Sequence, residues 1–202
     1  MRCAALGLTL ALLVLGVGSI GCGGKVVSRV DPNTTIDLSG YWNDTDSRLV
    51  AEEMISDCLS RPWKGNHVEE YGKRPVVIVG RIANKTTEHI ATTTFVSDLE
   101  RAFINSGDVG VVASSDERGQ VRDEREDQQI FSSAETAKQW GKEKGADYML
   151  GGIISSITDE EEGKKVTFYQ VDLNLIHLED NSKVWLGTKK IKKYIGKGKY
   201  RG

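Results

Sequence analysis

The last third of the sequence contains three strand-like segments in succession, and this pattern limits the fold more than any other feature. Residues 148–157 are mainly apolar, residues 166–178 come to alternate between apolar and polar, and residues 183–191 follow a short polar loop. Such runs, separated by polar loops, are typical of strands joined by hairpins. We therefore expect an acidic turn at 159–163, a second turn at 179–182, and a three-strand antiparallel meander.

The preceding half predicts strands and helices in alternation. Residues 75–82 form a short, continuously apolar and β-branched run, which is typical of a strand buried on both faces. Residues 92–105 carry apolar side chains at helical spacing, and Gly107 is a suitable C-terminal cap for that helix. A turn is expected at 83–86 and a second strand at 109–113.

Further helices are expected around this unit. One runs to about Ser60 with Asp44, Thr45 or Asp46 as its N-cap, and a loop over 61–73 follows, in which Trp63 packs back. The fold class is therefore α/β (α+β), a mixed sheet of about four to five strands flanked by helices. Two remaining segments complete the prediction, a solvated helix and a set of helical turns: 116–129 and 133–144.

The first 22 residues resemble a bacterial lipoprotein signal. Arg2 precedes an apolar run over residues 4–15, and small residues lead to Cys22. In such signals the cysteine is diacylated and becomes the new N-terminus, so residues 1–21 are the expected signal and Cys22 the expected lipid anchor. Ser19 stands where leucine is usual, which leaves an ordinary cleaved signal or an uncleaved anchor helix as alternatives. Gly23, in place of aspartate, favours the outer membrane, with the protein on its periplasmic face.

The mature chain is expected to contain a lipidated N-terminus with a flexible linker over 22–40 and one globular domain over 41–202. Fully extended, such a linker reaches about 60 Å. Removal of Arg2 leaves 26 basic and 29 acidic residues, a charge of −3 that does not favour nucleic-acid binding. Cys58 then has no disulfide partner, and its place on the apolar side of a helix predicts a buried structural thiol.

No enzyme motif or metal-ligand spacing is present in the sequence. His67, His89 and His177 are isolated, and the acidic run at 159–162 is better explained as a solvated turn than as a cation site. The chain is therefore expected to be a non-enzyme without cofactor or metal. Of the basic residues near the C-terminus, those at 189–193 are interpreted as protection of an edge strand, the alternative being contact with an anionic lipid or polymer.

Residues 41–47 form the densest polar and aromatic cluster of the chain. One interpretation is a helix cap with a tryptophan folded onto the core. The other is a recognition surface, because exposed aromatic residues with polar neighbours are frequent at contacts. The sequence does not decide between the two.

Several segments, taken together, resemble the LpoB family, the lipoprotein activators of penicillin-binding proteins. They occur in order over nearly all of residues 39–195, which is far more specific than any single motif. The resemblance implies a fold like the N-terminal domain of TolB. The segments are Ser39-Gly40-Tyr41-Trp42-Asn43-Asp44-Thr45-Asp46-Ser47, Arg74-Pro75-Val76-Val77-Ile78-Val79-Gly80, Asn84-Lys85-Thr86 with Glu88-His89-Ile90, Glu124-Arg125 with Gln128-Gln129, Gly145-Ala146-Asp147-Tyr148-Met149-Leu150-Gly151-Gly152, Phe168-Tyr169-Gln170-Val171 and Lys183-Val184-Trp185.

This resemblance implies an outer-membrane-anchored, monomeric lipoprotein that docks on a small non-catalytic domain of a bifunctional (class A) penicillin-binding protein. Docking would stimulate glycan polymerisation and peptide cross-linking in peptidoglycan synthesis. The alternative is an assembly or secretion lipoprotein of the CsgG-like or TolB-like kind that binds another envelope partner. The expected contact residues are Tyr41, Trp42, Asn43, Asp44, Asp46, Asn84, Lys85, Glu88 and His89.

Overall fold

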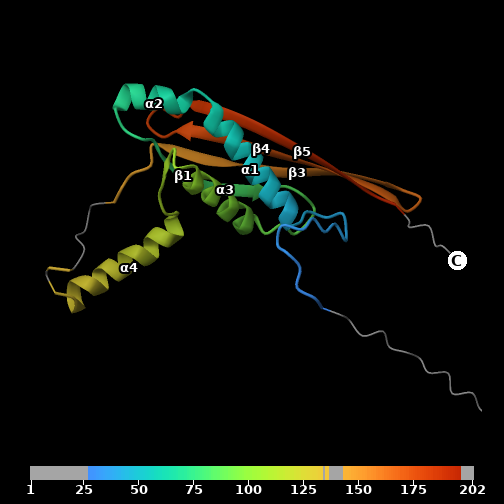
Figure 1. Ribbon diagram of the computed structural model, residues 1–202, viewed down its shortest axis with the longest axis horizontal. Coiled ribbons are helices and arrows are strands. Elements are labelled where there is room, and N and C mark those ends of the chain that lie inside the picture. The colour runs from blue at the N-terminus through green and yellow to red at the C-terminus, as the bar shows by residue number, and fades with distance from the viewer. Residues whose placement is uncertain (1–26, 134, 137–142, 197–202) are drawn as a thin grey trace, which may run out of the picture. The chain divides into compact units, whose positions relative to one another are not determined.

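The computed structural model describes residues 27–133, 135–136 and 143–196, and its contacts divide the chain into two units, Met1–Pro32 and Asn33–Gly202. Every described helix and strand belongs to the second unit (Figure 1). Within the described residues these are four helices and five strands, in chain order α1 (Asp44–Ser60), α2 (Trp63–Tyr71), β1 (Val76–Asn84), α3 (Thr92–Ser106), β2 (Gly110–Val111), α4 (Ser115–Phe131), β3 (Tyr148–Glu161), β4 (Lys164–His177) and β5 (Lys183–Ile195).

The strands form one mixed sheet in the order β2-β1-β3-β4-β5. β1 lies parallel to both β2 and β3, whereas β3, β4 and β5 are antiparallel neighbours. The predicted α/β class and the three-strand meander are therefore confirmed. Because β5 has a neighbour on one side only, it is the edge strand that the lysine-rich sequence indicated.

The hairpin between β3 and β4 is longer than predicted. The acidic turn expected at 159–163 is wrong, because β3 continues through Glu161 and only Glu162 and Gly163 form the turn. Both turn residues have positive φ, of 51° and 75°, the backbone of a tight two-residue hairpin. Glu161 lies opposite Lys164 and Glu160 opposite Lys165, so cross-strand charge pairs support the extension.

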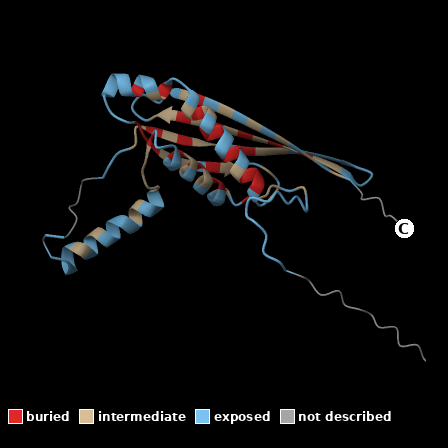
Figure 2. Cartoon of the chain, in the orientation of Figure 1, coloured by how far each residue is buried: buried red, intermediate tan, exposed pale blue. Residues whose placement is uncertain are grey.

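Helices α1 and α3 pack together and cover one face of the sheet (Figures 1 and 2). Phe95, Leu99 and Phe103 of α3 are fully buried, as the helical spacing predicted, and Gly107 takes the expected left-handed C-cap conformation. Val50, Met54 and Cys58 of α1 join the same core. Burial raises the pKa of the Cys58 thiol to about 12, so it is a structural rather than a reactive thiol.

Two local predictions were wrong. The N-cap of α1 is Asn43, one residue before the expected candidates, because its side chain accepts the amide of Asp46. The segment 61–73 is not a loop throughout, since α2 occupies most of it. The polar composition of α2 concealed it, and only Trp63 and His67 are buried. Trp63 does pack back as predicted, with its indole nitrogen 2.7 Å from the carbonyl oxygen of Cys58.

Several predictions concern residues outside those described: the signal over 1–21, Cys22, most of the helical turns at 133–144, and the chain beyond 196. Helix α4 has no buried residue, in agreement with the predicted solvated helix. Among the residues that can be described, no helix has the length and apolar character needed to cross a bilayer.

The two adjacent glycines of β3 give a test of this packing. A Cβ on Gly152 would overlap the carbonyl oxygen of Asp172 and lie 2.7 Å from a methyl carbon of Leu173, whereas one on Gly151 would come no closer than 3.8 Å to another atom. We expect Gly152→Ala to lower the free energy of unfolding by about 2 kcal/mol. Gly151→Ala is the matched control and should be near neutral in urea denaturation. Equal stability of the two variants would contradict the described register.

Candidate functional site

The first turn of α1 is closed by a reciprocal pair of hydrogen bonds. The side chain of Asn43 accepts the backbone N–H of Asp46, and the carboxylate of Asp46 accepts the backbone N–H of Asn43, each at 3.0 Å. This capping box satisfies two amides that a helix end otherwise leaves unpaired. Asn43 also donates to Asp37 at 2.7 Å. The preceding segment is thereby tied to the helix.

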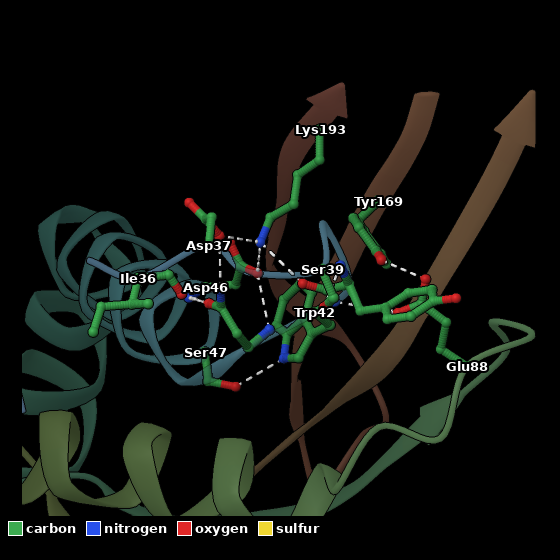
Figure 3. Close-up of polar contacts among 11 residues, drawn as sticks. Ile36, Asp37, Ser39, Trp42, Asp46, Ser47, Glu88, Tyr169 and Lys193 are labelled. Atoms are coloured by element: carbon green, nitrogen blue, oxygen red, sulfur yellow. Dashed lines mark hydrogen bonds and ion pairs between the residues drawn. The ribbon is translucent and has the colours of Figure 1, made fainter. Parts of the chain in front are cut away.

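Lys193 of β5 holds this helix start against the edge of the sheet (Figure 3). Its ammonium lies 2.6 Å from Asp46 and 2.8 Å from Asp37, and it donates to the carbonyl oxygen of Tyr41 at 3.0 Å. The side chains of Lys193 and Asp46 are 11% and 10% exposed. We call these four residues, Asp37, Tyr41, Asp46 and Lys193, the Lys193 clamp.

The clamp raises the pKa of Lys193 and lowers the pKa of Asp37. Burial by itself lowers the pKa of Lys193, but hydrogen bonds and charge attraction to Asp37 and Asp46 outweigh it and raise that pKa above its usual value. The hydrogen bond from Lys193 lowers the pKa of Asp37. Both groups therefore remain charged at neutral pH, and the clamp stays closed.

Trp42 fills the space between the clamp and the core. Its indole N–H donates to the hydroxyl of Ser47 at 2.8 Å, and its ring meets Phe95 and Tyr169 edge-on at centroid distances of 6.1 and 5.7 Å. Glu88 accepts the backbone N–H of Trp42 at 3.2 Å and the hydroxyl of Tyr169 at 2.5 Å (Figure 3). Burial, together with this bond to Glu88, raises the pKa of Tyr169.

The loop after β1 is shaped by Asn84. Its side-chain oxygen accepts the amide and the hydroxyl of Thr86, at 2.9 and 2.8 Å, and its side-chain nitrogen donates to the carbonyl oxygen of Glu88 at 2.8 Å. This local turn directs Glu88 inward towards Trp42 and leaves His89 exposed. The loop and the Trp42 segment, far apart in sequence, therefore form one surface.

A hollow of about 330 Å³ lies between these two segments. Lys165 of β4 closes one side, with its ammonium 4.7 Å from the centre of the Tyr41 ring. Among the described residues, no group of three or more His, Cys, Asp or Glu is placed to hold a metal ion. The hollow is lined by Tyr41, Trp42, Thr87, Glu88, His89 and Lys165.

The structure divides the predicted contact residues into two groups. The helix-cap interpretation of the 41–47 cluster is confirmed for Trp42, which is folded onto the core, whereas Tyr41 is 49% exposed and the recognition surface stays a prediction. The side chains used inside the protein are Trp42, Asn43, Asp46, Asn84 and Glu88. The exposed ones are Tyr41, Asp44, Lys85 and His89.

Sequence reasoning missed Lys165 and Lys193. Both belong to strands in which inward and outward positions alternate, and both fall on the helix-covered side. A lysine at an inward position between Ile191 and Ile195 is the signal that could have identified Lys193, because such a charge needs an acidic partner. That partner comes from the N-terminal segment, which the strand pattern does not reveal.

A second hollow, of about 470 Å³, lies beside α2. His67 is buried there, with Nδ1 3.1 Å from the hydroxyl of Tyr148 and Nε2 3.7 Å from Asp147. Burial lowers the pKa of His67, so the ring is neutral at pH 7. The ring of Tyr148 has neighbours in both His67 and His177, at centroid distances of 5.4 and 4.9 Å, so these two histidines, isolated in sequence, flank one tyrosine.

Two lysines of β5 allow the stability contribution of the clamp to be compared with that of an exposed ion pair. Lys193→Met should lower the free energy of unfolding by about 3 kcal/mol, because it leaves the buried carboxylate of Asp46 without its partner. Lys189→Met is the matched control, since Lys189 pairs with the exposed Glu53, and should cost less than about 1 kcal/mol. Urea denaturation at pH 7 measures both.

The same pair of variants predicts a pH dependence. Because the pKa of Asp37 is lowered by folding, its contribution is complete above its unfolded pKa and is lost as the pH falls through the folded value. The raised pKa of Lys193 means that its contribution is lost only as the pH rises above its usual value. The cost of Lys193→Met should therefore shrink in acid, and a cost that does not change there would contradict the clamp.

Comparisons with known proteins identify the family of the chain. The family model described as the peptidoglycan-synthase activator LpoB matches residues 46–191, more than half of the chain. No curated protein sequence matches. LpoB-family activators are not enzymes, which confirms the expectation drawn from the missing motifs.

Solved structures to which the chain is similar include LpoB domains. The C-terminal domain of LpoB from Escherichia coli is 17% identical over 75% of this chain and 99% of that one, with a TM-score of 0.41. The corresponding Salmonella enterica domain is 16% identical over 72% and 98%, with a TM-score of 0.40. Lipoprotein GNA1162 from Neisseria meningitidis is 14% identical over 59% and 83%, with a TM-score of 0.38. The family assignment depends on the sequence match, and by that match the chain belongs to the LpoB family of peptidoglycan-synthase activators.

Proposed function

We propose that this protein binds and activates a bifunctional (class A) penicillin-binding protein from the periplasmic face of the outer membrane. The observation that carries the proposal is the LpoB family match over residues 46–191, because members of this family act on a peptidoglycan synthase. The bifunctional class of the synthase, the membrane and a monomeric state are the parts that we add.

The activation is proposed to be allosteric. An effector that makes no covalent change can accelerate a synthase only if it binds the active conformation more tightly than the resting one. A rigid contact surface favours this, because little conformational entropy is lost when it docks. The Lys193 clamp and the hydrogen bonds of Glu88 supply that rigidity around the hollow.

The contact surface is proposed to be the exposed rim of the hollow. Tyr41, 49% exposed, presents an aromatic ring beside the Lys165 ammonium, and His89 is exposed on the opposite loop. Aromatic residues next to charged ones are frequent anchors of protein interfaces. Asp44 and Lys85 complete the exposed members of the predicted set.

The anchor is proposed to be a lipid on Cys22. Since the compact unit begins at Asn33, the chain between these two residues spans at most about 40 Å when fully extended. The domain is thus held close to its membrane, and the synthase has to come within that distance. Because the linker is short, activation would depend on the distance between the anchoring membrane and the synthase.

The direct test is glycan polymerisation by the organism's own class A penicillin-binding protein in detergent, with and without residues 23–202. We expect a saturable, several-fold acceleration. Tyr41→Ala combined with His89→Ala should lower the apparent affinity at least about tenfold, as expected for loss of an interface anchor. The control is Leu186→Ala, an exposed residue at the far end of β5. No acceleration by the folded wild-type domain would refute the proposal, and a double variant as active as wild type would refute the proposed surface.

The anchor has its own test. Cys22→Ala should move the protein from the membrane fraction to the soluble periplasmic fraction, because the acyl chains are lost. Mass spectrometry of the wild-type mature protein should find diacylglycerol on an N-terminal Cys22. A mature chain that begins elsewhere, or retains its first residues, would support the ordinary signal or the uncleaved helix instead.

A further inference from the structure

The lysines of β5 fall into two groups that behave differently. Lys189 and Lys193 lie on the helix-covered side, where they pair with Glu53 and with the clamp carboxylates. Lys190 and Lys192 lie on the other side, are exposed, and form no ion pair with any described residue. Strand alternation thus converts one run of lysines into paired structural charges on one side and free charges on the other.

Apolar side chains lie next to Lys192, whereas Lys190 stands opposite Gln170. Lys192 stands in register with Phe168 of β4, which is in register with Ile157 of β3, and Tyr194 stands opposite Val166. Ile157 is 70% exposed and Tyr194 65% exposed, although both are large and apolar. We call this surface the hairpin patch, and its residues are Ile157, Val166, Phe168, Lys190, Lys192 and Tyr194.

The N-terminal segment enters the compact unit beside the end of β5 that carries Tyr194. Asp37 is bonded to Lys193 (Figure 3). Gly40, with φ of 71°, lies so close to Ile195 that a Cβ would overlap its side chain. Residues 37–40 of the segment that leads from Cys22 therefore contact the end of β5 that carries Tyr194, on the helix-covered side of that strand. A lipid anchor on that segment would give the patch a high effective concentration at the membrane surface.

We propose that the hairpin patch docks on the anionic surface of the bilayer that holds the lipid anchor. Free ammonium groups beside exposed aromatic and aliphatic side chains suit the boundary between charged headgroups and acyl chains. Asp159 is an acid on the same side of β3, while Glu160 and Glu161 of the hairpin tip are offset by Lys165 and Lys164 across the strand pair. The proposal uses the Cys22 anchor of the proposed function but not the synthase contact.

Docking in this way would orient the domain. The hollow lined by Tyr41, His89 and Lys165 includes side chains on the helix-covered side of the sheet, whereas the hairpin patch is on the other side. With the patch against the bilayer, the rim of the hollow is left free for a partner protein. Strand β4 would then contribute Lys165 to the hollow on one side of the sheet and Val166 and Phe168 to the membrane contact on the other.

Vesicle binding by unlipidated residues 23–202 tests the proposal, since this chain contains the whole compact unit. Phosphatidylcholine vesicles with and without phosphatidylglycerol are compared by co-sedimentation at low salt. We expect binding only to the anionic vesicles, weakening as salt is raised. Lys190→Gln with Lys192→Gln should lower the partition coefficient about 25-fold, because each lysine near an anionic surface contributes about a factor of five. Ile157→Ser should lower it several-fold.

Matched controls lie on the same strand and side. Lys183→Gln and Leu186→Ser change an exposed lysine and an exposed leucine nearer the other end of β5, about 30 Å and about 20 Å from Lys192 along the strand, and should leave the partition unchanged. Circular dichroism checks that each variant is folded. Three results would overturn the proposal: no binding to anionic vesicles, equal loss in the control variants, or loss only when residues 197–202 are removed. Because the polymerisation assay contains no bilayer, failure here leaves the synthase result untouched.

Discussion

The buried ammonium of Lys193 is the interaction on which the rest of the structure depends. It joins the last strand of the sheet to the segment that precedes the first helix, through carboxylates at 2.6 and 2.8 Å. A charge this well buried is stable only when it is paired on several sides, and the capping box of α1 holds Asp46 in the position required. The two ends of the fold are therefore fixed by one side chain.

Fixing the ends has consequences for function. The ring of Trp42 packs against Phe95 and Tyr169, and Glu88 accepts the backbone N–H of Trp42. Tyr41 and His89 remain exposed at the rim of the hollow. An activator of the LpoB family acts by binding, not by catalysis, so a rigid and exposed rim is the feature that its task requires. We propose that this rim meets the synthase while the opposite side of the hairpin meets the membrane.

Elements with strong local patterns could be predicted from the sequence, and elements without them could not. The strand β1 follows from a continuous apolar run, and the meander from strand-like runs separated by polar loops. The helix with Phe95, Leu99 and Phe103 follows from the helical spacing of its apolar residues. Helix α2 was not predicted because it buries only two residues and has no apolar stripe. The Lys193 clamp escaped because it pairs residues more than 140 positions apart, and no local pattern encodes such a contact.

The sequence drew attention to two segments that the structure brings together, but it did not predict what most of their side chains do. The cluster at 41–47 and the loop at 84–89 do form one surface, yet most of their polar side chains bond within the protein.

Hydrogen exchange of residues 23–202, alone and saturated with the class A penicillin-binding protein, tests the central claim most directly. The account predicts that the amides of 85–89 and of the Tyr41 segment exchange more slowly in the complex. Unchanged exchange there, with protection confined to another surface or found nowhere, would contradict it.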